Sequence, residues 1–144
     1  MKKILIFSNG EKMGDGLIKL PFIHEIFFQF TNCNLTWVAY GTTVYSTTLK
    51  KMSSKYIYNV MDNAELQILP WKKISQKYDF EKEYYDIIID TQKTVYKTIA
   101  LKRIKSKIFI SSAASWLFSD LKPKKKLKSK KYYLDSLFDM LGLL

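Results

Sequence analysis

The chain has 144 residues, enough for one domain with a substantial core, and its 47% hydrophobic and 15% aromatic content excludes a disordered protein. A single cysteine, Cys33, and a single histidine, His24, exclude an internal disulfide and the common Cys/His metal clusters. The formal net charge of +11 is concentrated in residues 102–131, which contain eleven Lys or Arg side chains and one acid, Asp120.

The first predicted element is a buried strand over Lys3 to Ser8, a short β-branched and apolar run that ends at a turn. A glycine-bearing loop, Gly10 to Gly16, follows the strand. Apolar residues at helical spacing then predict a helix that extends to about Phe30. Pro21 interrupts this stretch, so we expect either an irregular first turn or a regular helix that begins near the proline.

The remaining predicted elements alternate between strands and helices. Strands are predicted over Leu35 to Tyr40, Tyr56 to Met61, Glu65 to Leu69, Tyr85 to Thr91 and Lys107 to Ile110. Helices are predicted over Gly41 to Met52, within Trp71 to Glu83, over Lys93 to Ile104 and over Tyr132 to Leu144. The lysine-rich segment Lys122 to Lys131 is predicted to be a solvated loop.

This alternation of continuous apolar strands with helices indicates an α/β fold. We expect a Rossmann-like, mostly parallel sheet with helices on both faces, in one domain over residues 1–144. Ligands of such sheets bind at the carboxyl ends of strands where the strand order reverses, and the loop after the first strand is the usual place. The short apolar stretch after Met1-Lys2-Lys3 does not resemble a signal peptide, and we expect a cytoplasmic protein.

The segment Gly14-Asp15-Gly16 fits neither common nucleotide-binding pattern. The dinucleotide pattern needs a small residue at position 19, where this chain has Lys19, and the P-loop pattern needs Gly-Lys-Ser/Thr, which is missing. What remains is a carboxylate between two glycines. Asp15 is therefore either the N-cap of the next helix or a functional carboxylate on a loop that a ligand approaches closely.

The order of several motifs resembles glycosyltransferase family 9, which includes the ADP-heptose:lipopolysaccharide heptosyltransferases. That family begins with an apolar strand, a loop carrying Gly-Asp and an apolar stretch with Leu-Pro, and this chain has Ile4 to Phe7 and then Met13 to Phe22. Tyr85 to Gln92 is similar to the family's Tyr-Asp-x-x-x-Asp-x-Gln strand and exit, and Asn34 to Val38 occupies the place of its second strand. The resemblance covers most of residues 1–121.

The resemblance implies that the chain is the N-terminal, acceptor-side half of a GT-B architecture, a truncated protein without the C-terminal donor-binding domain. It implies a bacterial, inverting transferase of lipopolysaccharide core or related glycan synthesis that uses ADP-heptose or a similar nucleotide sugar, without a metal or other cofactor. Asp15 matches the family's catalytic base. Gly14 and Gly16 would allow close approach of the acceptor, and Gln92 and Lys97 would contact the substrate from the crevice or serve only the first turn of a helix.

The acceptor would be a phosphorylated, lipid A/core-like glycolipid, and the chain alone would have negligible transferase activity. The favoured interpretation of the lysine patch, residues 102–131, is a solvated face. The second is a surface that attracts an anionic membrane, which would place the protein at the inner face of the inner membrane. Nucleic acid ranks last, because Arg103 is the only arginine and base recognition favours arginine. The alternative to an enzyme component is a non-catalytic remnant or a basic interaction module.

Overall fold

The computed structural model describes residues 1–124 and 133–144. Its five strands form one parallel sheet in the order β3-β2-β1-β4-β5, which confirms the predicted Rossmann-like α/β fold. The strands are β1 (Lys2–Ser8), β2 (Cys33–Ala39), β3 (Asn59–Met61), β4 (Tyr84–Asp90) and β5 (Lys105–Ser111). The helices are α1 (Met13–Gln29), α2 (Lys50–Ser53), α3 (Val95–Lys102) and α4 (Tyr133–Leu141), with 3-10 turns at Phe80–Lys82 and Ala113–Trp116.

The two central strands are the most buried part of the chain. Ile4 to Phe7 of β1 are completely buried and pair with Ile87 to Asp90 of β4, so the apolar runs that predicted these strands lie inside on both faces. The strand order reverses between these two strands, since β2 and β3 extend the sheet on one side and β5 on the other. A ligand site is therefore expected where β1 and β4 end.

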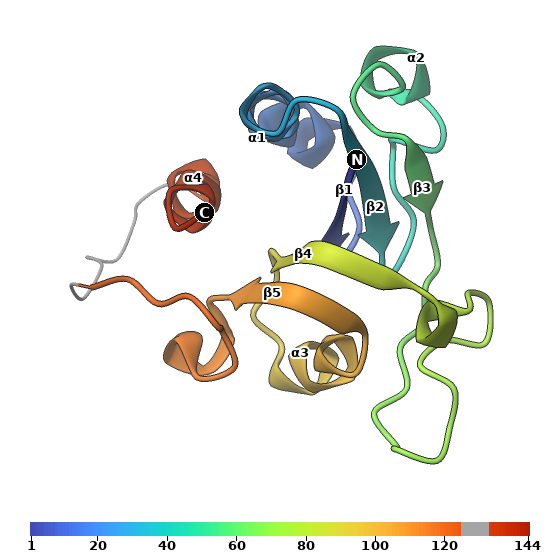
Figure 1. Cartoon of the computed structure of the whole chain (residues 1–144). Helices are drawn as coiled ribbons and strands as arrows, with labels where there is room; N and C mark the ends of the chain where they lie inside the picture. Colours follow the sequence, from blue (N-terminus) through green and yellow to red (C-terminus); the bar gives the residue numbers. More distant parts are fainter. Residues whose placement is uncertain (125–132) are drawn as a thin grey trace.

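Helices cover both faces of the sheet (Figure 1). On one face, α1 and α4 pack together, and the ring of Phe22 meets that of Phe138 edge to face at 6.3 Å. On the other face, α3 covers a second core that includes Phe7, Ile88 and Phe109. The prediction of a sheet covered on two sides is confirmed.

The first helix begins earlier than the sequence indicated. The expected loop Gly10 to Gly16 ends at Lys12, and α1 runs without a break from Met13 to Gln29. The expectation that Pro21 delays or disturbs the helix is wrong. Pro21 lies on the exposed side of α1, where its ring does not meet the core.

Three other expected elements are corrected. The predicted helix Gly41 to Met52 is mostly a series of hydrogen-bonded turns, which end in the four-residue α2. The predicted strand Glu65 to Leu69 forms a single antiparallel bridge, from Leu66 to Ser75. The predicted helix within Trp71 to Glu83 is only the 3-10 turn Phe80–Lys82.

The other elements lie where they were expected, with shifted ends. They are β3 within Tyr56 to Met61, α3 within Lys93 to Ile104, β5 around Lys107 to Ile110, and α4 within Tyr132 to Leu144. Most of the predicted loop Lys122 to Lys131 lies outside the described residues. None of the helices in the described part of the chain combines the length and the apolar character of a membrane span.

Candidate functional site

A cleft of about 430 Å³ opens at the point where the strand order reverses. Residues just after β1, on α1, just after β4 and at the start of α4 line it: Asn9, Gly10, Asp15, Lys19, Thr91, Gln92, Lys93 and Tyr133. The structure therefore brings together Asp15 and Gln92, which are 77 positions apart in the sequence. This is the location that the topology of a parallel sheet predicts for a ligand.

Asp15 is the third residue of α1, and its side chain is exposed at the cleft. The helix begins after Lys12, so Asp15 is not its N-cap. The carboxylate forms no hydrogen bond or ion pair with any residue in the described part of the chain. It lies in the first turn of a helix, where the helix dipole favours a negative charge. This leaves an ionisable oxygen pair free to accept a proton or a hydrogen bond from a ligand.

Below Asp15, a buried ion pair joins the loop to the helix. Lys19, one turn further along α1, places its ammonium 2.7 Å from a carboxylate oxygen of Glu11, and both side chains are less than a tenth exposed. The other Glu11 oxygen accepts hydrogen bonds from Thr43 Oγ1 at 2.6 Å and from the Trp37 indole at 3.1 Å. Because every oxygen of this carboxylate has a donor, Glu11 fixes the position of the Lys19 cation at the cleft.

Sequence reasoning missed both residues of this pair. The spacing of Asp15 and Lys19, four residues on a helix, is a signal that they share a face. No local signal identifies Glu11 as the partner of Lys19, because their pairing depends on the turn that folds the loop back over the start of the helix.

Gln92 lines the cleft, but its amide is engaged inside the protein. Its Nε2 donates to Asp90 Oδ1 at 2.8 Å, and its Oε1 accepts from the Thr94 backbone at the start of α3. Asp90 is completely buried and also accepts hydrogen bonds from Thr98 at 2.6 Å and Ser111 at 2.9 Å. Burial raises the pKa of Asp90 despite these donors. The network ties β4, β5 and α3 together behind the cleft, so Gln92 positions this wall.

Lys97 does not line the cleft but contacts Asn9, which does. It is buried, its ammonium donates to Asn9 Oδ1 at 2.6 Å, and it lies 3.8 Å from the centre of the Tyr40 ring. Asn9 itself lines the cleft. Lys97 therefore fixes the side chain of Asn9 and adds positive charge from behind it.

Tyr133 closes the cleft from the first turn of α4. Its hydroxyl donates to the Thr91 backbone carbonyl at 2.8 Å, and its ring lies 5.5 Å from the Lys19 ammonium. Desolvation of the hydroxyl raises its pKa to about 12, so it remains a protonated donor at neutral pH. No local sequence pattern indicates this role, because Tyr133 is distant in the chain from every other cleft residue.

The two glycines beside Asp15 face different surroundings. A Cβ on Gly14 would have no atom within 4 Å, whereas a Cβ on Gly16 would collide with Val44 Cγ2 and lie 3.0 Å from Leu49 Cδ1. The Tyr45 hydroxyl also donates to the Gly16 carbonyl at 2.8 Å. Neither glycine lines the cleft. Gly16 allows the first turn of α1 to pack closely against the turns that follow β2.

His24 and Cys33 do not line the cleft, and both pack against other parts of the fold. The His24 ring lies 4.1 Å from that of Tyr56. Cys33 is buried at the start of β2, and burial raises the pKa of its thiol. Within the described residues, no three His, Cys, Asp or Glu side chains are grouped so as to hold a metal ion.

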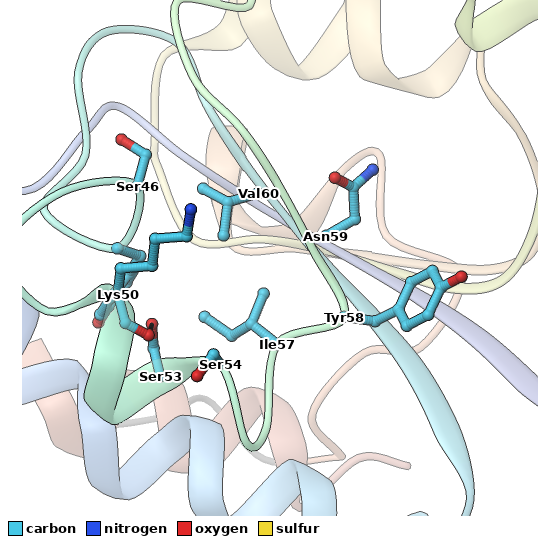
Figure 2. Close-up of a pocket in the computed structure, with 9 residues that line it drawn as sticks. Ser46, Lys50, Ser53, Ser54, Ile57, Tyr58, Asn59 and Val60 are labelled. Atoms are coloured by element: carbon cyan, nitrogen blue, oxygen red, sulfur yellow. Dashed lines mark hydrogen bonds between the residues drawn. The ribbon is translucent and has the colours of Figure 1, made fainter.

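A second hollow, of about 340 Å³, lies beside α2 and the edge strand β3 (Figure 2). Figure 2 shows the Lys50 side chain extending toward Ser46 and Val60, with Tyr58 directed away from the hollow. None of the site residues predicted from the sequence lines it. The cleft at the strand-order reversal is therefore the candidate site.

Comparison with solved structures finds the same fold in glycosyltransferases. The E. coli heptosyltransferase WaaC with ADP matches with a TM-score of 0.63 and 18% identity, over 97% of this chain and 46% of that one. The glycosyl transferase family 9 protein from Veillonella parvula DSM 2008 matches with 0.59 and 15%, over 99% and 42%. WaaC with ADP-2-deoxy-2-fluoro heptose gives 0.58 and 18%, over 99% and 49%.

These matches establish a shared fold and a difference in length. The chain spans slightly less than half the length of each of these three solved structures. No protein-family model and no curated protein matches the sequence. The fold expected from the resemblance to family 9 is confirmed.

Proposed function

We propose that residues 1–144 form the acceptor-binding half of an inverting glycosyltransferase with Asp15 as its general base. The observation that carries the proposal is the Asp15 carboxylate, exposed without a described partner in the cleft where the strand order reverses. Support comes from the fold, which two structures of a heptosyltransferase and one of a family 9 glycosyltransferase share. In a GT-B enzyme the donor half would close over this cleft.

In the proposed reaction, an acceptor hydroxyl attacks the anomeric carbon of a nucleotide sugar. The new bond from oxygen to carbon forms as the bond from that carbon to the diphosphate breaks, and Asp15 takes the hydroxyl proton. A positioned base of this kind contributes roughly 100- to 10,000-fold to the rate. Groups that stabilise the charge of the departing diphosphate are also required, and they would have to come from outside residues 1–144.

The charges around Asp15 suit an anionic acceptor. Lys19 and Lys93 line the cleft, and Lys97 lies directly behind Asn9. Glu11 and Lys19 neutralise each other as an ion pair, so among the described residues the uncompensated positive charge at the cleft comes from Lys93 and from Lys97 behind it. We therefore propose a phosphorylated, lipid A/core-like glycolipid acceptor, a donor such as ADP-heptose, and a place of action at the inner face of a bacterial inner membrane.

Titration of the purified chain with a deacylated, phosphorylated lipid A–core oligosaccharide, followed by NMR of the backbone amides, tests this assignment. Saturable shifts are expected at Gly10, Asp15, Lys19 and Lys93. The substitution Asp15→Asn should weaken binding several-fold because it removes the charged acceptor of the sugar hydroxyl. Glu25→Gln, an exposed site on the same helix, should not change the affinity.

Saturable binding that shifts other amides and leaves the cleft unchanged would refute the proposed site. An absence of binding would favour the alternative of a non-catalytic remnant that keeps the fold.

A further inference from the structure

A loop with an exposed tryptophan projects from the molecule at the end of the sheet opposite the cleft. The loop comprises residues 67–74 and precedes β4, and Figure 1 shows it extending beyond the other elements near the start of that strand. Trp71 at its tip is 76% exposed, and Ile68 is 44% exposed. Pro70, Lys72 and Lys73 beside them are exposed as well.

Hydrogen bonds hold this loop in a defined shape. At its base, the Gln67 amide donates to the Ile74 carbonyl at 2.7 Å, and Leu66 and Ser75 form an antiparallel bridge. At its tip, the Lys72 amide donates to the Leu69 carbonyl at 3.0 Å, which closes a turn around Trp71. The protein thus maintains an apolar tip in water with an ordered backbone beneath it.

Arg103 fastens the loop to a basic part of the surface. Its guanidinium donates to the carbonyls of Gln67 at 2.7 Å and Lys72 at 2.6 Å. Arg103 ends α3, and Lys105 and Lys107 of β5 follow it with exposed side chains.

The lysines at this end of the molecule are only partly matched by acids. In the described part of the chain, Lys72, Lys73, Lys105 and Lys107 form no ion pair with an acid. Three acids lie near the loop. Asp62 pairs with Lys77 at 2.8 Å, Asp79 pairs with Lys82 at 2.6 Å and also interacts electrostatically with Lys73, and Glu81 accepts a hydrogen bond from the Ile74 amide at the base of the loop. An exposed tryptophan surrounded by lysines matches the two components of an anionic bilayer interface, its apolar boundary and its phosphate groups.

We propose that this loop, residues 67–74, is a membrane-docking element that places Trp71 and Ile68 at the interface of an anionic bilayer. Lys72 and Lys73 contact the lipid phosphates, and Lys105 and Lys107 extend the same basic surface. This assignment does not depend on the proposed transferase activity, because it concerns the end of the sheet opposite the cleft. It also differs from attraction by the lysines of residues 122–131, because it requires an apolar side chain to enter the interface.

Sedimentation with vesicles of phosphatidylcholine containing 30% phosphatidylglycerol tests the proposal. The wild-type chain should bind these vesicles and should bind pure phosphatidylcholine vesicles far less. Trp71→Ser should lower the partition coefficient about ten-fold or more, and Lys72→Ala with Lys73→Ala should lower it by a similar factor, since each nearby lysine contributes roughly five-fold. Tyr58→Ser is the matched control, because Tyr58 is an equally exposed aromatic residue, at 77%, beside the edge strand β3.

Tryptophan fluorescence supplies a second readout on the folded chain. Trp37 is completely buried and Trp116 is partly buried, so Trp71, the most exposed of the three tryptophans, reports most directly on transfer from water to lipid. The emission of the wild type should shift to shorter wavelength with anionic vesicles, and Trp71→Phe should abolish the shift. Circular dichroism should be the same for all variants, because the replaced side chains are exposed.

Three outcomes of the vesicle experiments would overturn the proposal. They are unchanged binding of Trp71→Ser, an equal loss in Tyr58→Ser, and binding that is lost only in a Lys124/Lys125/Lys126→Ala variant. If duplex DNA bound in a Trp71-dependent manner while vesicles did not, the surface would be a nucleic-acid site and the membrane assignment would be wrong.

Discussion

Asp15 and Lys19 lie one turn apart on α1, but among the described residues only Lys19 has an ion-pair partner. Lys19 is fixed by Glu11, whose other oxygen accepts from Trp37 and Thr43, whereas Asp15 has no hydrogen-bond or ion-pair partner among the described residues. A buried charge is tolerated better when its hydrogen bonds are satisfied, and both oxygens of the Glu11 carboxylate have donors. The result is a fixed positive charge next to a free carboxylate, as a site for an anionic ligand with a reacting hydroxyl requires.

Gly14 and Gly16 provide a matched pair of substitutions on either side of Asp15. Gly16→Ala should destabilise the fold by about 1–3 kcal/mol, because its Cβ would collide with Val44 Cγ2 and crowd Leu49. Gly14→Ala should leave stability unchanged or raise it by up to about 1 kcal/mol, because alanine favours a helix and nothing lies within 4 Å of the added carbon. Urea unfolding of both variants measures the difference. Equal effects would show that Gly16 is not a packing glycine.

At the scale of elements, the sequence predicted the strands best where burial is complete. Ile4 to Phe7 and Ile87 to Ile89 are apolar throughout because both of their faces are covered, and this pattern is unambiguous. Glu65 to Leu69 resembled a strand because it alternates, yet only Leu66 finds a bridge partner. The apolar residues of that stretch belong to the exposed loop and its base, which sequence patterns do not distinguish from a half-buried strand.

The ends of the helices were harder to predict, for a different reason. The two glycines before Leu17 suggested a loop, but tertiary packing of Gly16 against Val44 stabilises a helix that already includes both of them. The place of the cleft could be predicted from the sequence, since the alternation of strands and helices indicates a parallel sheet and the Gly-Asp motif follows its first strand. The Glu11–Lys19 pair and the role of Tyr133 in the cleft could not be predicted. They depend on contacts between segments that only the fold brings together.

Asp120 joins β5 to α3 and closes an unusual turn. Ala114, Ser115 and Trp116 all have positive φ, between 48° and 68°, which L-residues adopt at a cost. Asp120 accepts hydrogen bonds from the Phe109 amide at 2.8 Å and from Lys102 at 2.6 Å. Partial burial works to raise the pKa of Asp120, but these two hydrogen bonds outweigh it and hold the pKa below its ordinary value of 3.8.

Asp120→Ala should therefore destabilise the fold by about 1–2 kcal/mol at pH 7. A carboxyl whose pKa is lowered by folding contributes stability above its unfolded-state pKa and loses this contribution as the pH falls through its folded-state value. The difference in the free energy of unfolding between wild type and Asp120→Ala should accordingly shrink as the pH is lowered below 3.8. Urea titrations at a series of pH values measure it. A difference that stays constant with pH would assign the effect to packing.

At the scale of the whole molecule, the two proposed surfaces lie at opposite ends of the sheet. The cleft is at the carboxyl ends of β1 and β4, and the loop with Trp71 lies near the amino end of β4. Strands of seven residues separate these ends by roughly 20 Å. If the loop docks on a bilayer, the cleft faces away from the lipid. An acceptor would then need its sugar to extend well beyond its lipid anchor, which favours an elongated glycolipid over a short one.

The proposed division of labour between two halves of a glycosyltransferase predicts what residues 1–144 can do alone. The purified chain should bind the phosphorylated acceptor but should neither bind ADP measurably nor transfer sugar from ADP-heptose, because the proposal assigns the nucleotide-sugar donor to the other half. Calorimetry with ADP and a coupled assay for ADP release measure both properties, with an intact heptosyltransferase as the positive control. Turnover at a normal enzymatic rate that disappears in Asp15→Asn would show that these residues hold a complete active site. This outcome would support Asp15 as the general base and would refute the proposal that a second half is required.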